Sequence, residues 1–125
     1  MKQSLFEIDF FEPEDDYGVV KAAVHKTGKL GFSSGAAKKI DFENNRYFKI
    51  GKNKADLEDK AIYMLNSGEI DKSAYKVSKA GDYYYLRIKN IIDSLGYDYI
   101  NESVIFNIQE MEGDGDIYYK LIRRK

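Results

Sequence analysis

The sequence contains no cysteine and no tryptophan, and only one proline and one histidine among its 125 residues. Without cysteine, the chain cannot form disulfides, thiolate metal sites or a cysteine nucleophile. A single histidine excludes a metal site built from several imidazoles. No apolar run approaches the roughly 20 residues that a membrane-spanning helix needs. We therefore expect no metal site, no other cofactor and no membrane partner.

Residues 1–16 do not form a leader pattern, because acidic residues interrupt their apolar run and no small-residue cleavage pattern follows. The expected location is therefore the cytoplasm. Apolar residues make up 43% of the chain and charged residues 33%, a balance typical of a soluble folded domain. A chain of this length forms one domain and buries roughly two-thirds of its unfolded surface. We expect a single domain over residues 1–125.

The net charge of −1 hides a strong segregation of charge along the chain. Residues 1–17 sum to −5, residues 18–54 to +7 and residues 55–70 to −3, while residues 71–125 balance. A basic stretch attracts polyanions such as nucleic acid in a salt-sensitive manner. The alternative is a solvated surface that the acidic N-terminal stretch neutralises.

Apolar spacing and turn residues predict mostly strands. Residues 5–11 form the first predicted strand, and Pro13 begins an acidic linker. Two series of elements follow. The first consists of strands 19–26 and 30–32 around a turn at Gly28, a helix 36–40 capped by Ser33 or Ser34, and strands 46–51 and 61–65. The second consists of strands 74–78 and 83–86 around a turn at Gly81, a helix 88–95 ended by Gly96, and strands 104–108 and 117–122 around a turn at 111–116.

The second series repeats the order of the first, with the Gly28 and Gly81 turns 53 residues apart. We interpret this as a duplicated ββαββ unit, with residues 18–70 and 71–125 as the copies. The fold class is therefore α+β and β-rich, with two repeats that share one barrel- or sandwich-like core. The proposed correspondences are Leu30 and Phe32 with Tyr83 and Tyr85, Phe48 and Ile50 with Phe106 and Ile108, and Ile62-Tyr63 with Ile117-Tyr118.

Residues 24–33, 36–40 and 47–51 (VHKTGKLGFS, AAKKI and YFKIG) resemble the AbrB/MraZ swapped-hairpin barrel. In that family a basic glycine turn precedes an apolar strand, a short helix and a closing hairpin. Residues 76–121 are similar, although Asp82 stands where the family has a base. The resemblance implies DNA binding by the first turn, through Lys26 and Lys29.

The paired aromatic residues also resemble the Whirly and Pur-alpha single-strand-binding folds, which are duplicated β-rich units. In that case Tyr83, Tyr84 and Tyr85 would stack on bases. Tyr83 and Tyr85 share one strand face and Tyr84 lies on the other, so only one set can belong to the core. The structural alternative is that these tyrosines form cross-strand aromatic pairs.

No catalytic constellation is present. His25 has no serine and aspartate partners in a recognisable pattern, and Ser33 and Ser34 fit a helix cap better than a nucleophile. Residues 31–39 lack the spacing of a phosphate-binding loop. The carboxylates at 56–59 and 110–116 lack EF-hand spacing. We therefore predict a non-enzymatic protein.

The leading hypothesis is a small nucleic-acid-binding protein, such as a DNA-binding regulator, whose DNA is duplex or single-stranded. The alternative is a protein-interaction or assembly module, including a homo-oligomer, that uses an exposed tyrosine-rich sheet face. The predicted nucleic-acid-binding residues are Lys26, Lys29, Lys38, Lys39, Arg46, Lys49, Lys52, Tyr83 and Tyr85.

Overall fold

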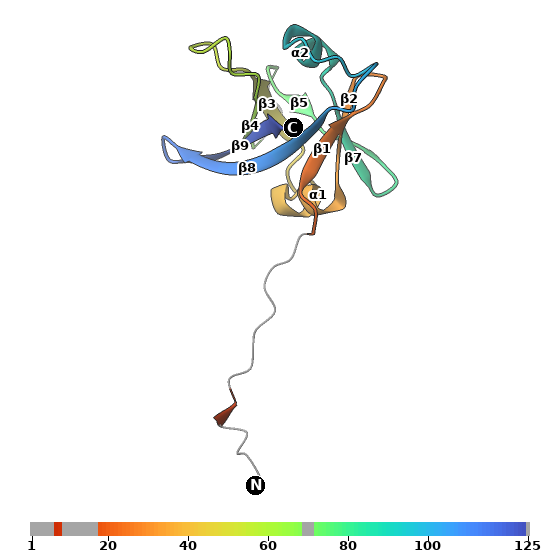
Figure 1. Cartoon of the computed structure of the whole chain (residues 1–125). Helices are drawn as coiled ribbons and strands as arrows, with labels where there is room; N and C mark the ends of the chain where they lie inside the picture. Colours follow the sequence, from red (N-terminus) through yellow and green to blue (C-terminus); the bar gives the residue numbers. More distant parts are fainter. Residues whose placement is uncertain (1–6, 9–17, 69–71, 125) are drawn as a thin grey trace.

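The computed structural model describes residues 7–8, 18–68 and 72–124, so most of the predicted strand at 5–11 lies outside the described residues. The described elements follow one another from β1 to β9 with two short helices (Figure 1). Their bounds are β1 Lys21–Val24, β2 Lys29–Phe32, α1 Ser34–Ile40, β3 Tyr47–Gly51, β4 Ile62–Asn66, β5 Tyr75–Lys76, β6 Ser78–Ala80, β7 Tyr83–Arg87, α2 Lys89–Ser94, β8 Ile105–Gly113 and β9 Asp116–Arg123.

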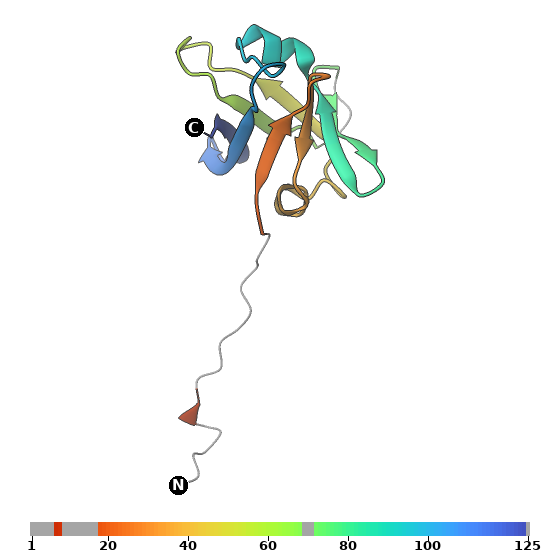
Figure 2. The same ribbon diagram turned by 45° about the vertical axis from the view of Figure 1, so that its right-hand side comes forward.

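The strands form one antiparallel sheet in the order β5-β3-β4-β9-β8-β1-β2-β7-β6. The two edge strands, β5 and β6, are consecutive in the chain and only Val77 separates them. The sheet therefore curls into a nearly closed barrel (Figures 1 and 2). Helices α1 and α2 lie at opposite ends of this barrel (Figure 1). A β-rich fold with few helices confirms the coarse expectation from the sequence.

The predicted turns and the helix cap are present. Gly28 and Gly81 have φ angles of 89° and 61°, which residues with a side chain rarely adopt, and each sits in the turn of a hairpin. The Ser33 hydroxyl accepts a hydrogen bond from the amide of Ala36 and so caps α1. These local signals act within a few residues, which is why the sequence could predict them.

The core fills the inside of the barrel with inward-facing side chains from both halves of the chain. Phe42 follows α1 and is fully buried. Its ring makes edge contacts with Phe32 and Phe48 at centroid distances of 4.8 and 5.5 Å, and a tilted contact with Tyr84. Such aromatic pairs add stabilisation beyond the burial of area alone. Phe42 thus joins strands that are distant in sequence.

Several residue correspondences between the two series are wrong. Leu30 and Phe32 face the core, whereas Tyr83 is 37% exposed and Tyr85 is half-buried. The inward-facing residues of β7 are instead Tyr84 and Leu86. The spacing from the turn glycine to the first inward-facing residue differs between the hairpins, and a shift of one residue exchanges the faces of a strand.

One further correspondence and one boundary differ from the prediction. Ile62 is fully buried and Ile117 is 53% exposed, so these two residues do not correspond. The predicted turn at 111–116 is shorter, because β8 continues to Gly113 and pairs with β9 up to Asp116. Pairing with the partner strand extends a ribbon whose polar composition suggested a loop.

Candidate nucleic-acid interface

The outer surface of β2 and β7 brings tyrosine and basic side chains together. Along β7, Tyr84 and Leu86 are buried, so the intervening residues point outward. The antiparallel register places Lys29 of β2 opposite Arg87 and Gly31 opposite Tyr85. We define the aromatic–basic face as the outward side chains of His25, Lys29, Tyr83, Tyr85 and Arg87.

The two tyrosines of this face are stacked, with ring centroids 6.1 Å apart and planes 22° from parallel. The Nζ atom of Lys29 lies 4.8 Å from the centre of the Tyr85 ring, and the Arg87 guanidinium lies 5.8 Å from it. Arg87 also donates a hydrogen bond of 3.4 Å to the Tyr85 hydroxyl. This hydrogen bond is the main cause that lowers the pKa of Tyr85 below its ordinary value.

Tyr83 is held in place across the neighbouring strand. Its hydroxyl hydrogen-bonds with Nε2 of His25, and the rings of the two residues are 5.7 Å apart. This contact depends on Gly31, because a Cβ atom there would lie 1.4 Å from the Tyr83 hydroxyl oxygen. Partial burial raises the pKa of Tyr83. The shift does not change the state of the phenol near neutral pH, because a tyrosine with the ordinary pKa of 10.0 is already uncharged there.

The structure brings four predicted site residues to one part of the surface. Lys26 and Lys29 lie at the β1–β2 turn and its following strand, and Tyr83 and Tyr85 lie on the adjacent β7. Lys26 is exposed beside this face and adds a further positive charge to those of Lys29 and Arg87.

The other predicted cations lie elsewhere. Lys38 and Lys39 are in the last turn of α1. Lys38 borders a groove of about 580 Å³, which is also lined by Asp41 and Glu43 after the helix and by Asp82 in the β6–β7 turn. Arg46 and Lys79 lie over the ring of Tyr84, at 5.1 and 5.4 Å from its centre. Lys49 is on β3, and Lys52 follows that strand. The seven predicted basic residues do not form one continuous surface.

Two residues of the aromatic–basic face were not among the predicted binding residues. Arg87 follows Tyr83 and Tyr85 at the two-residue period of a strand, so the alternation alone could have added it. His25 was considered only for catalysis. Its position beside Tyr83 depends on strand pairing between residues 58 apart in the chain, and no local pattern contains that information.

A second concave surface lies across β3, β4 and the β8–β9 hairpin. This groove of about 440 Å³ is lined by Lys49, Ile50, Gly51, Tyr63, Met64, Leu65, Gly113, Asp114, Asp116 and Tyr118. At its border the Tyr63 hydroxyl donates a hydrogen bond to the carboxylate of Asp59. This bond is the main cause that lowers the pKa of Asp59 and also raises the pKa of Tyr63. The groove has both apolar and charged walls, and the described residues that line it do not include a serine, threonine or cysteine next to a general base.

No protein-family model, curated protein or solved structure matches the chain. Within the part of the chain that the structure describes, no helix is long and apolar enough to cross a membrane. Among the same residues, no group of three or more histidine, aspartate or glutamate side chains is arranged to hold a metal ion. The aromatic–basic face is therefore the candidate site that the geometry favours.

Proposed function

We propose that this protein binds single-stranded nucleic acid on the aromatic–basic face and does so without catalysis. The observation that carries the proposal is the pair of stacked rings, Tyr83 and Tyr85, set between His25, Lys29 and Arg87. Stacking of a base on an aromatic side chain contributes about 1–3 kcal/mol and tolerates any base. The basic side chains supply attraction to phosphates, which positions a strand without specifying its sequence.

Single strands fit this face better than a duplex. Bases of a duplex are stacked on one another, so their ring surfaces are not available to tyrosine side chains. Lys29 and Arg87 lie over the Tyr85 ring, so a nucleotide whose base contacts the tyrosines has its phosphate within reach of these cations. Pairing of β2 with β7 sets the spacing of these groups.

Binding of a labelled oligothymidine, measured by fluorescence anisotropy over a range of salt concentrations, tests the proposal. We expect Tyr85→Ala to weaken binding several-fold with little change in its salt dependence. Lys29→Ala with Arg87→Ala should weaken binding and reduce the salt slope, by about 0.7 for each phosphate that the variant no longer neutralises. The matched control is Lys49→Ala with Lys52→Ala, which removes two exposed cations away from the face.

Absence of binding at low salt would contradict the proposal, and so would equal losses in the control and the face variants. The resemblance to AbrB and MraZ proteins supports a second mode, in which the β1–β2 turn contacts duplex DNA. In that mode a duplex would bind more tightly than a single strand, Lys26→Glu with Lys29→Glu would abolish binding, and Tyr85→Ala would have no effect.

We also infer that the chain arose by duplication of a ββαββ unit, and the strand pairing supports this. Strand β1 pairs with β2 and β8, while the continuous β5–β6 segment pairs with β7 and β3. The pairs β2–β7 and β4–β9 join equivalent strands. The first hairpin of each unit thus pairs with the second hairpin of the other. This exchange is what a swapped-hairpin barrel implies.

A further inference from the structure

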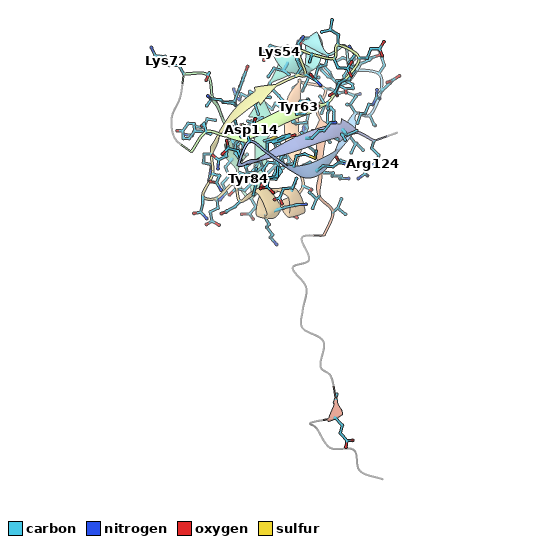
Figure 3. The ribbon with its side chains drawn as sticks, turned by 90° about the vertical axis from the view of Figure 1, so that its left-hand side faces the viewer. Lys54, Tyr63, Lys72, Tyr84, Asp114 and Arg124 are labelled. Atoms are coloured by element: carbon cyan, nitrogen blue, oxygen red, sulfur yellow. The ribbon has the colours of Figure 1, made fainter. Side chains whose placement is uncertain are left out.

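The β8–β9 hairpin extends beyond the barrel as a two-stranded ribbon. Strand β1 pairs with β8 only as far as Asn107, and β4 pairs with β9 only from Tyr118 onward. Residues 109–111 therefore pair only with β9, and at the tip residues 112–113 pair with residues 116–117, with which no other described strand pairs. We define residues 109–117 as the acidic arm. Figure 3 views this arm from its tip, where Asp114 is labelled.

One face of the acidic arm combines carboxylates with an exposed apolar residue. Glu110 and Glu112 continue the face of β8 that carries the buried residues Phe106 and Ile108. Glu112 lies directly opposite Ile117, whose side chain is 53% exposed. Residues 108–119 contain four acidic residues and no lysine or arginine. An apolar side chain that is more than half exposed thus lies beside carboxylates near the tip of the arm.

The acidic arm and the aromatic–basic face are complementary in chemistry and in spacing. Both are built on strands, so their side chains repeat every two residues, at roughly 7 Å. Glu110 and Glu112 match the spacing of the outward residues of β7. A carboxylate can form a two-pronged ion pair with the Arg87 guanidinium, and an isoleucine can pack against the tyrosine rings. Opposite potentials on two surfaces steer their association and fix its register.

The two surfaces of one molecule cannot meet each other. In Figure 1 the tip of the β8–β9 hairpin and the β6–β7 hairpin lie at opposite sides of the barrel, and Figure 2 agrees. Strand β1 separates β8 from β2 in the sheet. We propose that the acidic arm of one molecule docks on the aromatic–basic face of a second copy. Two different surfaces meet in this contact, so the assembly is head-to-tail and extends as an open chain or closes as a ring.

Docking of the arm would affect nucleic-acid binding, although the docking proposal does not depend on the proposed function. The arm and a nucleic acid occupy the same side chains, so the two compete for the face. Addition of an oligonucleotide that binds there separates the copies. Electrostatic attraction dominates both contacts, so salt weakens both.

Sedimentation velocity of the full chain at low and high salt tests the assembly. We expect the weight-average mass to rise with protein concentration at low salt and to return to the monomer at high salt. The arm variant, Glu110→Gln with Glu112→Gln, and the face variant, Lys29→Gln with Arg87→Gln, should each remain monomeric. In an equimolar mixture of the two variants, the intact arm of the face variant can dock on the intact face of the arm variant, and no second contact between intact surfaces is available.

That mixture separates specific docking from general charge effects. We expect the mixture to form heterodimers and nothing larger, since each heterodimer leaves only the two altered surfaces free. The matched control, Glu43→Gln with Glu58→Gln, changes the net charge equally at exposed positions outside the arm and should associate as the unaltered chain does. Denaturant midpoints establish that each variant is folded.

A monomeric unaltered chain at all concentrations in low salt would overturn the proposal, as would normal association of the arm variant. A chain that starts at Gly18 identifies another occupant. If removal of residues 1–17 abolishes association while the arm is intact, the acidic N-terminal stretch occupies the face instead. Oligonucleotide binding by the arm variant separates the two proposals, because it should persist whether or not assembly is found.

Discussion

At the scale of single residues, Gly31 determines the geometry of the aromatic–basic face. The position is buried, and a Cβ atom there would also lie 2.7 Å from Nε2 of His25. The glycine has no positive φ, so the requirement is space and not backbone conformation. Sequence inspection could find the tyrosines of β7, but the need for a glycine opposite them arises only when β2 and β7 pair.

Gly31→Ala should therefore weaken oligonucleotide binding in the same way as a substitution of Tyr83. The new methyl group displaces the Tyr83 ring, which breaks its contact with His25 and disturbs the stack on Tyr85. We expect oligonucleotide affinity to fall as far as it does in Tyr83→Ala. Gly51→Ala is the control, because a Cβ atom at Gly51 has nothing within 4 Å. Unchanged binding by Gly31→Ala in the anisotropy assay would refute the role assigned to the Tyr83 ring.

The Asp59–Tyr63 hydrogen bond predicts a small dependence of stability on pH. A carboxylate whose pKa is lowered by folding stabilises the native state above its unfolded pKa, near 3.8, and this contribution disappears as pH falls through the folded value. Tyr63→Phe should reduce the free energy of unfolding by less than about 1 kcal/mol at pH 7, because the pair is largely solvated. The difference from the unaltered chain should shrink below pH 3.8.

Urea denaturation across this pH range measures the difference. Tyr118→Phe is the matched control, since its ring lies 6.3 Å from that of Tyr63 without a bond to Asp59. A loss at pH 7 that persists unchanged in acid would show that packing, and not the Asp59 carboxylate, is the cause.

At the scale of elements, local signals predicted the hairpins and helices better than the ends of the strands. Ser33 was predicted as a local helix cap, and its side chain also contacts residues distant in sequence. Its hydroxyl caps α1 and also accepts a hydrogen bond from the Lys21 amide at 3.1 Å, while it donates to the Val19 carbonyl at 2.6 Å. The helix start and the beginning of β1 are thus connected through one side chain.

Ser33→Ala should cost about 1–2 kcal/mol of folding free energy, toward the upper end for a helix cap, because it removes three hydrogen bonds together. Ser34→Ala should be nearly neutral, since Ser34 is exposed and alanine is favoured within a helix. Chemical denaturation of both variants provides the measurement. Equal stability of the two variants would contradict the connecting role of Ser33.

The second helix shows where apolar periodicity was only partly informative. The stripe at Ile88, Ile91, Ile92 and Leu95 predicts a helix over 88–95, and α2 spans Lys89–Ser94. Ile88 precedes the helix and provides no side-chain cap. Tertiary burial of Ile88 and Ile92 stabilises a short helix that capping does not.

At the scale of the whole molecule, the barrel depends on residues that join distant strands. Phe42→Ala should cost about 3–5 kcal/mol, because it leaves a cavity between Phe32, Phe48 and Tyr84. That loss is a large share of the stability of an ordinary domain. Leu57→Ala is the control at a side chain that is 74% exposed, and it should change stability by less than about 0.5 kcal/mol. Thermal and denaturant unfolding measure both, and similar losses would contradict the assignment of Phe42 to the centre of the core.

The sequence by itself determined the features that depend on a few neighbouring residues. These are the glycine turns at 28 and 81, the Ser33 cap, the strand alternation that separates Tyr84 from Tyr83 and Tyr85, and the segregation of charge along the chain. Each of them is set by backbone conformation or by the period of one element. The absence of cysteine likewise excludes its chemistry without any structure.

Only the tertiary structure decided which residues share a surface. Lys29 and Tyr85 are far apart in sequence, and they meet because the burial of Leu30 and Leu86 in one core sets the register of β2 against β7. The same packing disperses the other predicted cations over the barrel and leaves an acidic ribbon beyond its end. The register of strands that are distant in sequence is set by which side chains the whole core buries, and the pattern of a single segment does not contain this information.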